Sequence, residues 1–326
     1  HEQGMAMENL GDIDQQSIAG AISTGTHGTG ISFGSLSTQV LRLSFINGLG
    51  EKVSCSKYEN PELFKAAQIS LGTLGIITEL TLQCVPSYKL ELIIDKTTLK
   101  EVLSSYKEII KNNRNFEYYW FPNTEFVMTK VCNVTDDPVD KSGLKNYFQD
   151  YVLENYAFKL ICEFAKIFPS KSIWTSKFSA KTISYHRKVN YSHKVLVAPR
   201  LVKFNEMEYN VPLEAYEDVM KDVVKWINKN NRTVHFPIEN RFVKGDDIYL
   251  SPSYERDSAY IACHVYNKKE FTPFFTASTA GLNLSIYPQV RITLFFSASL
   301  ASFSPSSDLY VIGFSTNTCF LAFTNF

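Results

Sequence analysis

Alternating apolar and polar residues in the first part of the chain predict a hairpin, a helix and a third strand. Val40–Ile46 alternates in polarity, an Asn-Gly pair follows it, and Lys52–Cys55 predicts the returning strand. We predict a short helix over Pro61–Ala67, because proline is tolerated in the first turn of a helix. The apolar, β-branched run Gly75–Leu82 predicts a buried strand.

The pattern changes near Pro86, where longer amphipathic segments begin. Thr98 and Glu101 have capping-box spacing at the start of a helix that runs to about Ile110. A second amphipathic helix is predicted from about Pro212 to Ile227. Three further strands are predicted at Phe116–Phe121, Val234–Phe236 and Tyr260–Val265.

These elements favour an α+β fold in which helices pack on a mostly antiparallel sheet. The length of 326 residues exceeds what one hydrophobic core usually supports, so we expect two domains. We place them at residues 1–88 and 89–272, followed by a low-charge tail at 273–326.

Composition narrows the functional classes. The chain has 33 basic and 33 acidic residues and no Lys/Arg block, which argues against nucleic-acid binding. A hydrophobic share of 44% and a charged share of 20% are typical of a globular protein. Six cysteines without a C-x-x-C pair argue against a zinc cluster and favour a reducing compartment.

The two ends differ from the middle of the chain. The sequence begins at His1 without a recognisable signal peptide. Residues 273–326 carry only two charges, Arg291 and Asp308, but no clean apolar stretch of ~20 residues. We therefore interpret this tail as sequence foreign to the fold, with a membrane-facing tail as the alternative.

The run Gln16–Gly30 concentrates glycine and hydroxyl side chains. Its glycines permit close backbone approach, and Ser17, Ser23, Thr24 and Thr26 supply hydroxyl groups. Such a loop can surround a pyrophosphate with N–H and O–H donors. Its order matches neither G-x-G-x-x-G nor the P-loop, so a plain turn and a phosphate site both stay open.

Four more residues are candidates for chemistry. Glu239 and Arg241 share one face of an extended segment, either as an ion pair or as the lining of a polar substrate cavity. His264 lies in an apolar strand, as a hydrogen-bonded core residue or as a pocket donor or base. His27 has no second His or Cys at metal-ligand spacing, so we expect a structural histidine and no metal site.

The segment Asn9–Gly28 resembles the sugar-1,4-lactone oxidases, the aldonolactone branch of the vanillyl-alcohol-oxidase flavoprotein family. Gly72–Thr78 resembles the second flavin-domain motif of that family. Three segments resemble its lactone-oxidase domain: Phe204–Tyr209, Pro237–Phe242 and Asp246–Pro252. The motifs occur in the same order between about Gly4 and Phe271, which makes the resemblance specific.

This resemblance implies that residues 1–88 are the second half of a PCMH-type FAD-binding domain and that 89–272 form a truncated, lactone-binding cap domain. It implies FAD-dependent oxidation of an aldono-1,4-lactone by O2, giving H2O2 and an ascorbate-type product. D-arabinono-1,4-lactone is the implied substrate, with L-gulono- or L-galactono-1,4-lactone oxidase or dehydrogenase activity as the alternative. It further implies an intracellular protein associated with the mitochondrial membrane.

The resemblance also implies roles for individual residues. FAD would be held by Gly11, Ser17, Gly20, Thr24, Gly25, Thr26, His27, Ile76 and Ile77. Asp12 would lie near the substrate end of the flavin, and His264 would line the pocket. Glu239 would bind substrate hydroxyls, and Arg241 would stabilise negative charge on the reduced flavin. Gly11 favours an oxidase, because a missing methyl group leaves room for oxygen near the flavin.

Two family motifs are not found in this sequence: the V-G-x-G-H-S loop, whose histidine often carries the flavin, and the C-terminal H-W-x-K signature. We therefore expect an incomplete chain. A catalytically inactive fragment is the non-enzyme alternative.

Overall fold

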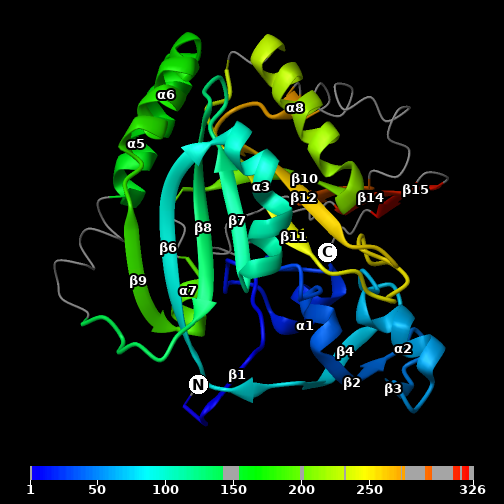
Figure 1. Cartoon of the computed structure of the whole chain (residues 1–326). Coiled ribbons are helices and arrows are strands. Elements are labelled where there is room, and N and C mark those ends of the chain that lie inside the picture. Colours follow the sequence, from blue (N-terminus) through cyan, green and yellow to red (C-terminus); the bar gives the residue numbers. More distant parts are fainter. Residues whose placement is uncertain are drawn as a thin grey trace.

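The computed structural model describes residues 2–141, 154–198, 202–230, 233–272, 274–275, 291–295, 311–315 and 318–322. In this part of the chain, sheets of two, three and ten strands are built from antiparallel pairs (Figure 1). Helices pack beside the sheets, so the predicted α+β fold is confirmed.

The three-stranded sheet contains the predicted hairpin. Its order is β3-β2-β4, with β2 at Val40–Ile46, β3 at Lys52–Ser56 and β4 at Ile76–Leu82. Two short helices lie near it, α1 at Ile18–Ser23 and α2 at Pro61–Gln68, the second with proline in its first turn as predicted. A separate apolar core joins these elements through Ile22, Leu43, Phe45, Cys55 and Phe64.

The predicted strand at 75–82 is confirmed, but its predicted burial is wrong. β4 lies at the edge of its sheet with β2 as its partner, and its residues are exposed or half-buried. Ile76 is 75% exposed. An edge position leaves one side of a strand uncovered, which the apolar composition alone does not reveal.

The ten-stranded sheet has the order β15-β14-β13-β10-β12-β11-β7-β8-β6-β9. Its strands are β6 (Lys89–Thr98), β7 (Asn115–Trp120), β8 (Phe126–Val134), β9 (His186–Tyr191), β10 (Phe204–Pro212), β11 (Ile238–Val243), β12 (Ser258–Tyr266), β13 (Arg291–Phe295), β14 (Val311–Ser315) and β15 (Thr318–Ala322). A small pair, β1 (Met5–Ala6) and β5 (Val85–Pro86), connects the N-terminal segment to the chain just before β6.

Helices α3 (Leu99–Asn112) and α8 (Tyr216–Asn230) lie over one face of this sheet (Figure 1). The predicted capping box at Thr98 and Glu101 is confirmed, because the hydroxyl and the carboxylate each accept a hydrogen bond from the other residue's backbone N–H. The helix predicted from Pro212 begins as the 3₁₀ turn Leu213–Ala215 and becomes α-helical at Tyr216.

The described residues also form helices α5 (Glu154–Ile167), α6 (Ser172–Thr182) and α7 (Ser192–Leu196) and the 3₁₀ turns η1 (Leu36–Gln39) and η3 (Pro169–Lys171). No helix among the described residues is long and apolar enough to cross a membrane.

The predicted strand at Val234–Phe236 is wrong, because the strand begins at Ile238 instead. Val234 and Phe236 are nonetheless buried in the large core, where Phe236 packs against Phe158. Burial in irregular backbone gives the same apolar pattern as a strand. Pro237 lacks the backbone N–H that a sheet ladder needs, which delays the start of β11.

Parts of the low-charge tail take part in the sheet. β13 pairs with β10, and β14 and β15 extend the sheet outward from β13. The rest of 273–326, apart from residues 274–275, lies outside the described residues. The domain boundaries at 88 and 272 stay predictions.

Candidate active site

Strand β7 places apolar and polar side chains on opposite faces of the sheet. Phe116, Tyr118 and Trp120 belong to the core that also contains side chains of α3 and α8. Glu117 and Tyr119 alternate with them and therefore point to the other face. All five side chains are buried, so β7 is covered on both faces.

Strand β11 lies between β7 and β12 and adds to the same polar face. Glu239 is paired in register with Tyr119 of β7, and Arg241 with Glu117. On the other side, Arg241 is paired with Tyr260 of β12. Directly opposed residues share a face of an antiparallel sheet, so the two residues predicted as a pocket pair stand beside Glu117 and Tyr119.

Arg241 contacts three carboxylates. Its guanidinium forms an ion pair with Glu239, a second with Glu117 at 3.1 Å and a third with Asp12 at 3.3 Å. Its side chain is 12% exposed, so the pair is not a surface ion pair. Asp12 comes from the N-terminal segment, and Arg241 therefore also joins that segment to the ten-stranded sheet.

Tyr119 and Lys130 complete this network on β7 and β8. The Tyr119 hydroxyl lies 2.7 Å from Glu239 Oε1 and 3.1 Å from Glu117 Oε1. Lys130 Nζ donates to Glu117 Oε1 at 2.9 Å. Glu117 thus lies between two cations, which fixes its carboxylate beside Arg241.

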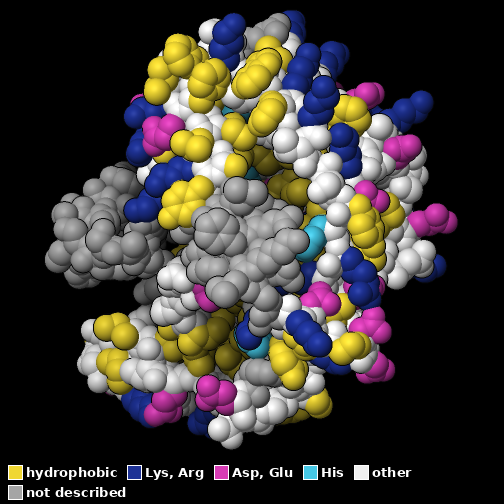
Figure 2. Space-filling model, turned by 90° about the vertical axis from the view of Figure 1, so that its left-hand side faces the viewer, with side chains coloured by type: hydrophobic (Ala, Val, Ile, Leu, Met, Phe, Trp, Pro, Cys, Tyr) yellow, Lys and Arg dark blue, Asp and Glu magenta, His cyan; other side chains and the backbone are white. Residues whose placement is uncertain are grey.

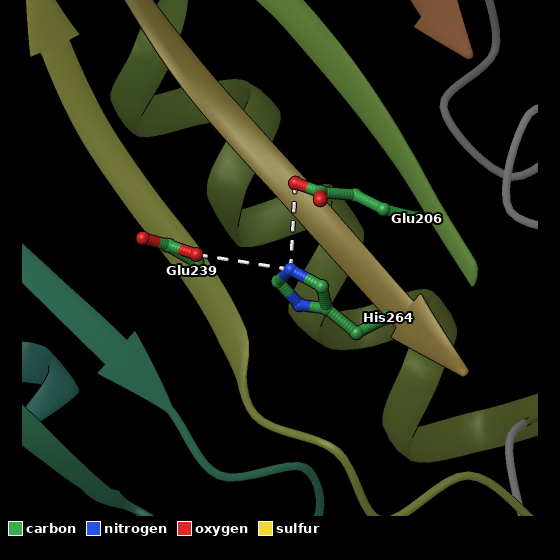
Figure 3. A group of neighbouring side chains, drawn as sticks. All are labelled: Glu206, Glu239 and His264. Carbon is green, nitrogen blue, oxygen red and sulfur yellow. Dashed lines mark ion pairs between the residues drawn. The ribbon is translucent and has the colours of Figure 1, made fainter. Parts of the chain in front are cut away.

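A second group lies next to Glu239 on strands β10 and β12. In Figure 3, Glu206, Glu239 and His264 point toward one another from three neighbouring strands. His264 Nε2 lies 3.4 Å from Glu206 and 3.7 Å from Glu239, while Nδ1 lies 3.4 Å from the carbonyl oxygen of Pro237. His264 therefore combines both alternatives of the sequence analysis, because it is buried and also faces polar groups.

The same three side chains bring one possible metal-ligand atom each to within 4.8 Å of one another. The sequence spacing did not reveal this group, because its members come from three strands. The ion pairs of His264 with both carboxylates account for the close approach, and we assign no metal to it.

Burial and neighbouring charges act in opposite directions on these acids. Burial raises the pKa of Glu239 above its usual value, and Glu117 and Asp12 raise it further, against the lowering effect of Arg241. Burial also opposes ionisation of Glu117, but Lys130 and Arg241 hold its pKa below the usual value. His264 similarly holds the pKa of Glu206 low.

The balance of charge on this face is negative. Five carboxylates (Asp12, Glu117, Glu206, Glu208 and Glu239) lie among two permanent cations, Arg241 and Lys130, and two histidines, His27 and His264. Excess negative charge in a buried site favours uptake of a proton. With its raised pKa, Glu239 is the carboxyl group best placed to hold and release one.

The predicted flavin loop folds back on itself through local hydrogen bonds. Ser17 Oγ caps α1 by accepting a bond from Gly20 N at 3.1 Å, and Thr24 Oγ1 donates to Gly20 O at 3.0 Å. Gly25 has a φ of +70°, a conformation that favours glycine. Ser17 and Gly20 are exposed, whereas Gly25 is buried.

His27 at the end of this loop contacts the polar face. Its Nε2 lies 3.2 Å from Glu208, its Nδ1 lies 2.8 Å from the carbonyl of Gly28, and its ring packs at 3.8 Å on Tyr260. These contacts agree with a structural histidine. Its predicted contact with FAD stays a prediction.

Gly11 is enclosed by the same loop. A Cβ atom at Gly11 would lie 3.1 Å from Thr26 Cγ2 and 3.5 Å from the carbonyl oxygen of His27. Gly11 and Asp12 therefore connect the loop to Arg241. Ile76 and Ile77, in contrast, lie on β4 in the separate three-stranded sheet.

Sequence reasoning missed Glu117, Tyr119, Lys130 and Glu206 as site residues. Glu117 interrupts the otherwise aromatic run at 116–121, and Glu206 interrupts a strand that is largely buried. A charged residue at an inward-facing strand position is costly unless it is paired. The sequence contains such charged positions, but they identify site residues only when the register between the strands is known.

The family described as D-arabinono-1,4-lactone oxidase matches residues 80–282, more than half of the chain. The chain belongs to this family. The match includes helices α3 and α8 and the strands that carry Glu117, Glu206, Glu239, Arg241 and His264.

Similar proteins are named as lactone dehydrogenases or lactone oxidases. The chain is 34% identical over 277 residues to an L-gulono-1,4-lactone dehydrogenase of Mycobacterium tuberculosis, covering 85% of this chain and 64% of that protein. It is 34% identical to L-gulonolactone oxidase of Bos taurus, covering 81% and 60%. Against D-arabinono-1,4-lactone oxidase of Debaryomyces hansenii it is 30% identical, covering 74% and 45%. The chain thus spans less than two thirds of each of these relatives.

Solved structures share the fold. A solvent-stable cholesterol oxidase aligns with a TM-score of 0.67 at 14% identity, covering 90% of this chain and 66% of that one. Cholesterol oxidase from Brevibacterium sterolicum aligns with a TM-score of 0.60 at 16% identity, covering 84% and 62%. These similarities confirm the predicted fold class.

Proposed function

We propose that the chain oxidises a sugar 1,4-lactone with FAD as cofactor, and that the lactone binds at the polar face of the ten-stranded sheet. The family match and the names of its relatives support this reaction class. The observation that carries the proposal is the contact of Asp12 with Arg241. It brings the predicted flavin loop to the buried charged network of β7, β10, β11 and β12.

The loop has the donor chemistry that FAD requires. No Asp, Glu, Lys or Arg occurs between Gln15 and Leu41, so no carboxylate of this stretch opposes the pyrophosphate. Exposed Ser17 supplies an O–H group, because its oxygen accepts from Gly20 N while its own proton stays available. Exposed Ile18 and Ile76 offer apolar surface for the rings. Bound FAD would accept the hydride that leaves the lactone carbon.

The polar face suits a neutral polyhydroxylated ring. Glu239 and Glu206 accept hydrogen bonds from hydroxyl groups, and Glu239 can take up the hydroxyl proton that is lost during oxidation. Arg241, Tyr119 and His264 hold these acids in place. The excess of carboxylates disfavours the anionic, ring-opened sugar acid, so the site selects the lactone form.

The preferred lactone and the electron acceptor form the finer part of the proposal. The family description favours D-arabinono-1,4-lactone, oxidised to dehydro-D-arabinono-1,4-lactone while O2 is reduced to H2O2. Glycine at position 11 supports an oxidase. The relative named as a dehydrogenase keeps L-gulono-1,4-lactone and a different acceptor as the second candidate.

A flavin spectrum tests the proposal. The purified chain is incubated with FAD, desalted, and mixed anaerobically with D-arabinono-1,4-lactone or L-gulono-1,4-lactone. We expect retained flavin bands that bleach with lactone but not with the corresponding sodium aldonate, and H2O2 on readmission of air. A chain without retained flavin would instead be a catalytically inactive fragment of the family. Bleaching that O2 does not reverse would identify a dehydrogenase.

A further inference from the structure

Glu208 of β10 is a buried carboxylate that the proposed reaction does not use. It lies on the polar face, where Ala262 of β12 stands opposite both Glu208 and Glu239 in the register. Glu208 is 3% exposed and forms an ion pair with His27, which is 6% exposed. In Figure 2, charged side chains of both signs lie on the outer surface, where water solvates them. A carboxylate buried as deeply as Glu208 needs a partner that compensates its charge.

The backbone around His27 fixes the position of its ring. The loop reaches the ten-stranded sheet at Gly30, whose N–H donates to the carbonyl oxygen of Phe242 at 2.7 Å. A Cβ atom at Gly28 would lie 2.1 Å from the carbonyl oxygen of Leu10, so this close approach requires glycine. The packed Gly28 carbonyl lies 2.8 Å from Nδ1 of His27. The imidazole is therefore held on one side through Nδ1, and its Nε2 is directed at Glu208.

These two contacts determine where the protons of His27 are. A carbonyl oxygen only accepts hydrogen bonds, so Nδ1 beside Gly28 O carries a proton. In a neutral imidazole, Nε2 would then present a lone pair to the Glu208 carboxylate, and two acceptors 3.2 Å apart repel each other. The contact becomes a hydrogen bond only with one further proton between Nε2 and the carboxylate. The geometry therefore requires a proton that the two groups share.

The surroundings favour this proton on the imidazole ring. Tyr260 of β12 packs on the ring, with the two centroids 3.8 Å apart, and the face of a tyrosine attracts a cation. Burial raises the pKa of Tyr260 well above its usual value, so its hydroxyl adds no negative charge of its own. The charges that act on Tyr260 are those of Glu208 and Asp246, the second from the loop after β11. Both are negative and favour an imidazolium beside them.

We propose that Glu208 is a positioning residue for the predicted flavin loop: it shares a proton with His27, and the resulting imidazolium–carboxylate pair fixes the end of the loop on the sheet. The link to flavin rests on the proposed function. Between Gln15 and Leu41 the sequence has no other titratable side chain, so His27 alone sets the charge of this segment. With the shared proton the pair is neutral overall. Without it, an uncompensated carboxylate stands beside the loop and opposes an anionic pyrophosphate.

Nitrogen NMR of the imidazole rings tests the shared proton and needs neither FAD nor activity. The full chain is labelled at the ring nitrogens of histidine, and the signals of His27 are assigned from their loss in His27→Asn. At about pH 7.5, a histidine in an unfolded chain is roughly tenfold more often neutral than charged. We expect both ring nitrogens of His27 to carry a proton at this pH. A neutral His27 ring in the folded parent chain would overturn the proposal.

One variant and one matched control show whether Glu208 holds the proton in place. Glu208→Gln keeps the size of the side chain, and its amide N–H donates to Nε2 without a shared proton. We expect His27 to become neutral at the same pH in this variant, with unchanged circular dichroism. Glu206→Gln removes a carboxylate of the same strand that pairs with His264, and should leave the signals of His27 unchanged. A second proton that persists in Glu208→Gln, or is lost equally in Glu206→Gln, would contradict the pairing.

The pH dependence of FAD binding tests the positioning role. FAD affinity of the parent chain is measured by ultrafiltration from pH 6.5 upward, and should fall roughly tenfold over the range in which NMR shows His27 losing its second proton. Glu208→Gln should change less than about twofold over this range, because its pair with His27 carries no charge to lose. Constant affinity of the parent chain through that range would overturn the role. Failure to retain FAD at any pH, with the shared proton present, would refute the proposed function and the role in flavin binding but confirm the pair.

Discussion

The two faces of the ten-stranded sheet are built from the same strands but on opposite principles. Toward α3 and α8, Phe242 packs against the rings of Tyr106 and Tyr216 at 5.6 and 5.1 Å, and Phe116, Tyr118 and Trp120 belong to the same core. Toward the N-terminal segment, five carboxylates and two permanent cations are buried or half-buried (Asp12, Glu117, Glu206, Glu208, Glu239, Lys130 and Arg241). We therefore expect the apolar face to stabilise the fold and the charged face to lower its stability.

This difference indicates where function lies. Burying ionised groups is unfavourable unless each is paired, and apolar substitutes of similar volume are often at least as stable. A net-negative buried network is therefore poor evidence for a role in stability. Its position beside the Gly11–His27 segment is the better explanation for it.

The largest effect is expected from the apolar face. Phe242→Ala removes a fully buried ring that stacks on Tyr106 and Phe116, and should lower the free energy of unfolding by ~3–5 kcal/mol. Urea unfolding measures this loss. Leu49→Ala, at an 83% exposed position, is the control and should change stability by less than about 0.5 kcal/mol. Equal effects at the two positions would contradict the assignment of this core.

On the polar face, Arg241→Met should cost ~3 kcal/mol, because it leaves Asp12, Glu117 and Glu239 buried together without their shared cation. The matched control is Arg42→Met, whose exposed pair with Glu59 should contribute less than ~1 kcal/mol. Adding Glu239→Gln to Arg241→Met should restore part of the loss. If it restores nothing, carboxylate repulsion is not the cause.

His235 provides a pH-dependent test on the apolar side. Burial, with a further contribution from Lys269, lowers its pKa to about 3, and its Nε2 has no hydrogen-bond partner in the described part of the chain. Between pH 6.5 and 3 the unfolded chain binds a proton that the folded chain excludes. Stability should therefore fall as the pH falls, by ~1.4 kcal/mol per pH unit for this group.

His235→Leu should remove this contribution, while the acid sensitivity due to Glu117 and Glu206 remains. Thermal unfolding of both proteins between pH 7 and 4 gives the comparison. We expect the variant to gain stability relative to the parent chain as the pH decreases. Parallel curves would show that His235 is not kept neutral by burial.

Two substitutions that each remove one hydroxyl group compare the roles of the two faces. Tyr118→Phe removes the hydroxyl contact with Tyr216 on the helix side and should cost ~1 kcal/mol of stability while kcat/KM stays unchanged. Tyr119→Phe removes a donor to Glu239 and should lower kcat/KM by roughly tenfold. Equal kinetic effects of the two substitutions would contradict the division of roles between the faces.

Local patterns predicted most of the fold, but not the assembly of the site. The β2–β3 hairpin, α2, the capping box of α3 and the aromatic strand β7 follow from spacing and turn chemistry. The prediction of a strand at Val234–Phe236 was wrong, because burial outside a sheet gives the same apolar run as a strand. Glu239 and Arg241 were predicted as a pair from their two-residue spacing, which a strand preserves.

Their partners were not predictable in the same way. Glu117, Lys130 and Glu206 reach the site only through the register of β8, β7, β11, β12 and β10, which depends on contacts far apart in sequence. The resemblance of Asn9–Gly28 to a flavoprotein family pointed to Asp12, but its ion pair with Arg241 is a tertiary contact.

The central claim is that the polar face is retained for reaction with the lactone rather than for stability. Glu239→Gln tests it most directly, because the substitution keeps the shape of the side chain and removes one of the crowded carboxylates. We predict unchanged or higher stability in urea, and a loss of lactone-dependent flavin reduction of about 100-fold or more. A variant that is clearly less stable but reduces flavin at the parent rate would contradict the claim.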